Sequence, residues 1–167
     1  MTICFAGAVL LGGCGGRPSR AADASGLPTG RAITRADLVR LPASRLRYPG
    51  SKVLELVGGD QTPNGDPEDP DPAYVGAVLT AKATPEQLYA WYRSVLERRG
   101  FAPATDLRPA DETSGQAWHF HHRLQLQVGV LDPALLRTDR DITAPSVKGE
   151  IVYQAVLVGY MPGLPKY

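Results

Sequence analysis

Hydrophobic residues recur along this chain with two different periods, which predict two kinds of element. From Thr84 to Phe101 they return every three or four positions, a spacing that gathers them on one stripe of a helix. The stripe comprises Leu88, Trp91, Tyr92, Val95 and Leu96. Because the two aromatic residues share the stripe with leucine and valine, we interpret them as core residues and not as a ligand cage.

Both ends of this segment carry helix-boundary signals. Thr84 is suited to the N-cap, Pro85 to the first turn, and Gln87 completes a capping box three residues after the threonine. Gly100 can adopt the left-handed conformation that ends many helices. We therefore predict one main amphipathic helix over about residues 84–99.

Strict alternation replaces the helical period between Trp118 and Val130, where the even positions are apolar except at His122. A three-residue turn at 121–123 would pair Phe120 with Leu124 and would keep the apolar side chains on one face. The pattern favours this hairpin, and one long strand would preserve the same parity.

Three further apolar runs predict strands at 52–57, 73–81 and 150–160, and the last two are apolar on both faces, as in central strands. An acidic loop over 58–72 separates the first two, and residues 132–148 predict a long loop or an irregular crossing. Several strands around one helix indicate an α+β fold: an antiparallel sheet with the helix packed on one face, in a single domain at 48–163.

The amino-acid composition excludes only a few classes of function. The 167 residues include 18 basic and 17 acidic side chains, for a net charge of +1. Such a balance gives no single-sign field of the kind that nucleic-acid binders carry, so we expect no nucleic-acid partner. No sequence motif of a hydrolase, metalloprotease, phosphate-binding loop or dinucleotide-binding site is present.

The N-terminal residues predict a cellular location. An apolar run from Ile3 to Leu11 is followed by Gly12 and Gly13, directly before Cys14. This is the pattern of a signal peptide, and the run is too short to cross a bilayer as a helix, which takes about 20 apolar residues.

The tetrapeptide LGGC, Leu11 to Cys14, resembles the lipobox of bacterial lipoproteins. This resemblance implies that residues 1–13 are removed, that Cys14 is diacylated, and that the protein is extracytoplasmic and anchored to the cell membrane through its lipid. Cys4 would be lost with the signal peptide, which leaves no thiol for a disulfide. The abundance of Arg, Ala, Gly and Pro is typical of actinobacteria. The combination of the lipobox, a tether and a strand followed by WYRSVLERRGF also resembles small secreted actinobacterial lipoproteins of unassigned function.

Residues 14–47 predict a lipidated cysteine and a flexible basic tether, most clearly over 15–33, where no hydrophobic period is visible. Seven arginines lie between Gly15 and Gly50, so the segment is either an electrostatic hold on anionic lipid or an ordinary solvated linker.

Two groups of side chains are candidates for metal binding. His119 and His121 would share one face of an extended strand, with His122 next to them, but a zinc site needs further ligands. Asp60, Asp66, Glu68, Asp69 and Asp71 of the acidic loop match no calcium-binding spacing. We therefore predict no cofactor.

Two hypotheses of function remain. The first is a non-catalytic binding module, anchored in the cell envelope, whose partner is an envelope protein or a small ligand. The alternative is a metal-binding protein or metal-dependent enzyme that uses His119 and His121.

Overall fold

The computed structural model describes residues 26–28, 31–62, 71–104, 114–134, 136 and 149–160. Its elements, in chain order, are α1 (Arg35–Arg40), the 3-10 helix η1 (Pro42–Arg45), β1 (Lys52–Gly59), β2 (Ala73–Ala81), α2 (Pro85–Glu97), β3 (Ala102–Pro103), β4 (Ser114–Phe120), β5 (Leu124–Val130) and β6 (Ile151–Gly159). The signal peptide and Cys14 predicted from the sequence lie outside the described residues.

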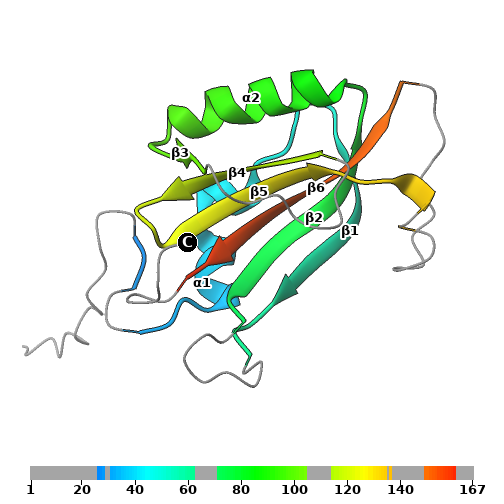
Figure 1. Ribbon diagram of the computed structural model, residues 1–167. Helices are drawn as coiled ribbons and strands as arrows, with labels where there is room; N and C mark the ends of the chain where they lie inside the picture. The colour runs from blue at the N-terminus through cyan, green and yellow to red at the C-terminus, as the bar shows by residue number, and fades with distance from the viewer. Residues whose placement is uncertain are drawn as a thin grey trace, which may run out of the picture.

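The strands form one six-stranded sheet in the order β1-β2-β6-β5-β4-β3, and every neighbouring pair is antiparallel (Figure 1). The predicted α+β class is confirmed. The strands with apolar residues on both faces, β2 and β6, lie side by side in the interior of the sheet, as the sequence predicts.

The hairpin of β4 and β5 has the predicted register. Phe120 pairs with Leu124 and Trp118 pairs with Leu126, around a three-residue turn at 121–123. His121 and His122 adopt left-handed backbone conformations in this turn, with φ of 48° and 52°. The turn therefore keeps the apolar residues of both strands on one face.

Helix α2 begins and ends where its sequence signals indicate. The Thr84 hydroxyl accepts a hydrogen bond from the backbone N–H of Gln87, and the Gln87 side chain accepts one from the backbone N–H of Thr84. At the other end Gly100 has a φ of +82°, and the N–H of Phe101 donates to the carbonyl of Leu96 over 3.1 Å. This is a glycine-dependent helix end.

The main core lies between the two helices and one face of the sheet. Alternate residues of the strands meet the predicted stripe of α2, of which Leu88, Tyr92 and Leu96 are buried and Trp91 and Val95 are partly buried. Burial raises the pKa of the Tyr92 phenol, whose hydroxyl donates to the carbonyl of Leu46. The interpretation of the stripe as core is confirmed.

A smaller core lies on the other face of the sheet. Val78 of β2 and Val152 of β6 are buried there together with Leu136, which follows β5. Leu136 belongs to the segment that the sequence predicts as a loop. It explains why β2 and β6 need apolar side chains on both faces.

The prediction of a flexible tether up to residue 47 is wrong for its last part. Helix α1 and η1 occupy this segment, and five of its residues belong to the main core: Leu27, Ile33, Leu38, Ala43 and Leu46. A helix of six residues is too short to show a period in the sequence. Within the described residues, the folded domain begins at Leu27 and not at residue 48.

Close packing joins this N-terminal segment to the sheet. A Cβ atom added to Gly159 of β6 would lie 2.7 Å from Ile33 Cγ2 and 3.1 Å from Leu38 Cδ2. Glycine therefore provides the space that Ile33 and Leu38 fill over the end of β6.

Truncation tests whether the segment is part of the domain. A chain that begins at residue 26 should unfold at the same urea concentration as the full chain, whereas one that begins at residue 48 should not fold cooperatively. The second loses the buried side chains of Leu27, Ile33, Leu38 and Leu46, worth about 8 kcal/mol together at roughly 2 kcal/mol each. That sum is comparable to the total stability of a domain. Cooperative unfolding of the shorter chain would contradict this packing.

Substitution of Gly159 tests the close approach itself. Gly159→Ala should lower the free energy of unfolding by about 1–3 kcal/mol, because the added methyl overpacks the site. In an Ile33→Ala background the same substitution should cost less, since the nearest atom is gone. Equal costs in the two backgrounds, measured by urea denaturation, would show that the two residues do not meet.

Candidate functional site

The histidines predicted as metal ligands lie on different parts of the hairpin. His119 is in β4, where it pairs with Ala102 and Gln125, whereas His121 is in the turn and packs edge-on against the ring of Phe120. Their spacing predicts both on one face of a strand, but the strand ends at Phe120, before His121. Within the described residues, no three His, Cys, Asp or Glu side chains form a group able to hold a metal ion.

The acidic loop is only partly described, since residues 63–70 lie outside the described ranges. Thr62 and Asp71 form an isolated antiparallel bridge at its base. Asp60 has a structural role: its Oδ1 accepts a hydrogen bond of 2.8 Å from the backbone N–H of Arg35, in the first turn of α1.

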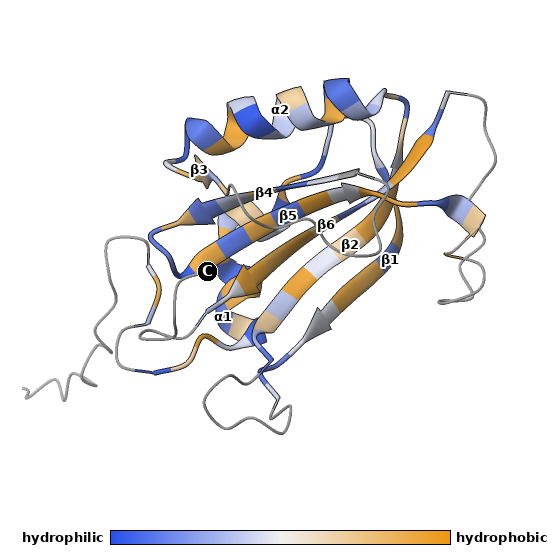
Figure 2. Cartoon of the chain, viewed as in Figure 1, coloured by the Kyte–Doolittle hydropathy of each residue, from blue (hydrophilic) through white to orange (hydrophobic). Residues whose placement is uncertain are grey.

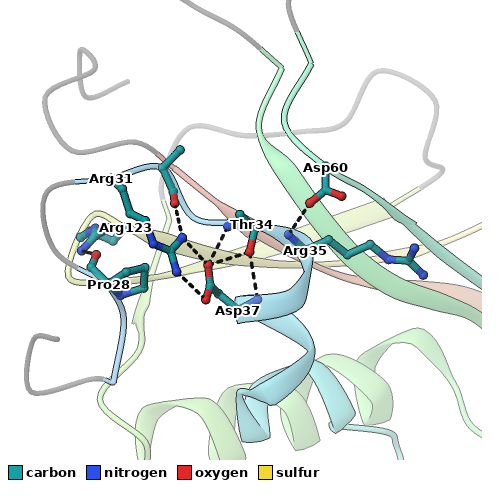
Figure 3. Close-up of polar contacts among 8 residues, drawn as sticks. Pro28, Arg31, Thr34, Arg35, Asp37, Asp60 and Arg123 are labelled. Atoms are coloured by element: carbon teal, nitrogen blue, oxygen red, sulfur yellow. Dashed lines mark hydrogen bonds and ion pairs between the residues drawn. The ribbon is translucent and has the colours of Figure 1, made fainter. Parts of the chain in front are cut away.

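A network of polar contacts fixes the N-terminal segment to the domain (Figure 3). The guanidinium of Arg31 donates to both carboxylate oxygens of Asp37 over 2.7 and 2.9 Å. Asp37 also accepts from the backbone N–H and the hydroxyl of Thr34, which caps α1. The Arg123 side chain donates to the carbonyl of Pro28 over 2.8 Å and so connects the chain before α1 to the β4–β5 turn. We call these five residues the N-terminal latch.

The latch changes the interpretation of the basic segment. Of the seven arginines between Gly15 and Gly50, five lie in the described segment 31–47. Arg31 pairs with Asp37, and Arg47 donates to the backbone carbonyls of Ser44 and Leu46. Only two of the seven, at positions 17 and 20, precede the domain, and three others, Arg35, Arg40 and Arg45, are exposed on α1 and η1.

The two edge strands of the sheet differ in how they are protected against pairing with another strand. At one end β3 has two residues, and Pro103 cannot donate a backbone hydrogen bond. At the other end β1 has eight residues, none of them proline, and it pairs with β2 on one side only. A register shift interrupts this pairing between Val53 and Glu55, and the strand is regular from Glu55 to Gly59. Figure 2 shows the hydrophobic stretch of β1 at this outer edge. Among the described strands, β1 is the long open edge.

Large apolar side chains of β1 are exposed on the face that the helices cover elsewhere. Val53 pairs with Leu79 and Leu56 with Ala77, so both lie on the helix-covered face. Their exposed fractions are nevertheless 51% and 72%. The reason is the placement of the helices: α1 has its main contacts with β2 and β6, and α2 with β3 and β4. Of β1, Gly58 lies under the side chain of Arg35, whereas Val53 and Leu56 stay exposed.

The other face of this edge carries an aromatic and an acidic side chain. Tyr74 of β2 is 41% exposed, and its ring lies over Gly59, where an added Cβ would approach Cε1 to 2.9 Å. Glu55 pairs with Val78 on the same face. We call β1 with the side chains of Val53, Glu55, Leu56 and Tyr74 the β1 edge surface.

Sequence reasoning did not find the β1 edge surface, although it predicted the strand. The run KVLELV indicates a strand with hydrophobic residues, and nothing in it distinguishes an edge strand from a covered one. Exposure of Leu56 depends on how far the helices reach across the sheet, which only the packing decides.

Comparison of the chain with protein-family models, with curated proteins and with solved structures finds no match. No helix in the described part of the chain is long and apolar enough to cross a membrane.

A low pH should reduce the contribution of the N-terminal latch to stability, and a substitution of Asp37 measures this contribution. Hydrogen bonds from Arg31 hold the pKa of Asp37 well below its usual range, and those from Thr34 add to this effect. A lowered pKa means that the ionised carboxylate stabilises the fold above the unfolded-state pKa of about 4, and that this contribution is lost as the pH falls below it. Asp37→Asn should therefore cost about 1–2 kcal/mol at pH 7 and less at pH 3.

Urea denaturation at both pH values measures this difference. Glu97→Gln, at an exposed position of α2, is the matched control and should change the stability little at either pH. A pH-independent cost of Asp37→Asn would contradict the role of the ion pair.

Proposed function

We propose that the protein is a lipoprotein of the cell envelope, and that its domain is a non-catalytic binding module that takes an extended segment of a partner protein at the β1 edge surface. The observation that carries the proposal is the open edge of β1, with Val53 and Leu56 exposed beside it. Unpaired backbone groups on an edge strand can pair with an added strand, and exposed apolar side chains next to them add contact area.

The anchoring part of the proposal depends on Cys14 and on the point where the fold begins. Between Cys14 and Leu27, the first buried residue in the described part of the chain, there are 12 residues, positions 15 to 26. A flexible coil of that length has an r.m.s. reach of about 19 Å, against about 32 Å for a tether that extends to residue 47. The latch therefore favours a domain held close to the membrane surface.

The alternative function, a metal-binding protein or metal-dependent enzyme, depends on His119 and His121. No observation among the described residues favours it, because His121 lies in the turn beyond β4.

Photo-crosslinking in living cells tests the binding surface. A photoreactive amino acid in place of Leu56 should give a discrete adduct with one partner. The same amino acid in place of Arg93, which is exposed on α2, should give at least severalfold less. Leu56→Lys should prevent the adduct from a photoreactive group at position 53, because a charge replaces the apolar contact. Equal adducts from positions 56 and 93 would contradict the proposal.

Fractionation of cells tests the anchor separately. The unaltered protein should incorporate a palmitate analogue and sediment with membranes, whereas Cys14→Ala should do neither. Cys4→Ala is the matched control and should behave as the unaltered protein. Membrane association that survives Cys14→Ala would contradict lipidation as the anchor.

A further inference from the structure

Glu55 is a half-buried carboxylate on the edge strand, in apolar surroundings. Its pairing partner Val78 is fully buried, and Leu54 and Val57 pack partly buried against the same small core. The Oε2 atom of Glu55 is buried and has no hydrogen-bond partner in the described structure. A buried charged oxygen that lacks a partner costs free energy, so this position favours the approach of a cation.

The described part of the chain does not provide that cation. The salt bridge there joins Arg31 to Asp37. The side chain of Arg35 lies over Gly58, which pairs with Val75 and so belongs to the helix-covered face, opposite to Glu55. Lys52 shares the face of Glu55 but makes no salt bridge with it.

The two faces of β1 present different chemistry at successive positions. Leu56 points to the helix-covered face and Glu55 to the other. A strand that pairs along the free edge places its own successive side chains on alternate faces, and paired residues share a face. Adjacent positions of the partner therefore meet a carboxylate and a leucine.

We propose that the partner segment alternates basic and apolar residues, with Lys or Arg opposite Glu55 and an apolar residue opposite Leu56. This inference rests on the proposed addition of a strand at β1. In the apolar surroundings of Glu55 an ion pair is less screened than at an open surface. Backbone hydrogen bonds alone would bind many strands of different sequence, and the carboxylate of Glu55 would favour those with a basic residue opposite it.

A second copy of this chain fits the edge less well. The regular part of β1 runs from Glu55 to Gly59, after a register shift at 53–55. In an antiparallel pairing of this part with itself, Glu55 meets Glu55, Val57 or Gly59 of the other copy, according to the register. None of these is a cation, and two carboxylates opposite one another destabilise a pair. The structure therefore favours a partner of different sequence.

The test uses the full chain and synthetic peptides of about nine residues, the length of a long strand. The first peptide alternates valine with lysine, the second has glutamine for each lysine, and the third has the composition of the first in two blocks, valine then lysine. Fluorescence anisotropy measures the three dissociation constants. Amide hydrogen exchange shows whether the backbone of β1 becomes protected.

The alternating lysine peptide should protect the β1 amides and bind about tenfold tighter than the glutamine peptide, as a charged hydrogen bond would predict. Glu55→Gln should remove this difference. Leu56→Lys should weaken both peptides, and Glu97→Gln, the matched control, should change neither.

Three other outcomes would overturn the inference in distinguishable ways. Equal binding of the lysine and glutamine peptides at β1 would refute the role of Glu55 and leave strand addition standing. Equal binding of the alternating and block peptides would show a non-specific attraction between charges. No protection of β1 by any peptide at millimolar concentration would refute both this inference and strand addition at β1.

Discussion

The width of the sheet relative to its helices governs the rest of this structure. The axes of six strands about 4.8 Å apart lie about 24 Å from the first to the last. On one face this width is covered by α1, α2 and η1. Neither helix has the edge strand β1 among its main contacts, which are those of α1 with β2 and β6 and of α2 with β3 and β4. Leu56 and Val53 are exposed for this reason, although they lie on the face that elsewhere forms the main core. The candidate binding surface is a consequence of incomplete cover and not of a separate site motif.

The segment around α1, held by the N-terminal latch, determines which part of the sheet is covered. Without α1 and the residues around it, the middle of the helix-covered face would lose Ile33 and Leu38, which pack against Gly159. The same segment sets the length of chain that separates the domain from Cys14. One structural element thus completes the core and shortens the proposed tether. This connects the stability of the domain to the distance at which the β1 edge surface would stand from a membrane.

The sequence predicted those helices and strands whose ends and register are fixed by residues close together in the chain. The capping box and Gly100 fix α2 within a few residues, and the alternation on both sides of the turn at 121–123 fixes the hairpin register. The prediction failed at 31–47 because α1 has six residues and buries only Leu38. Its stability comes from contacts with β2 and β6, whose partner residues follow much later in the sequence.

The sequence by itself determined the fold class, the main helix and the central strands, because backbone capping and side-chain periodicity act over a few residues. It also predicted the lipid attachment at Cys14, which lies outside the described residues. Only the tertiary structure decided that residues 31–47 belong to the core and that Glu55 and Leu56 stand on an open edge. The exposure of Leu56 and the unpaired oxygen of Glu55 depend on which segments pack over the sheet. Those segments are distant in the sequence, so no local pattern of residues predicts their packing.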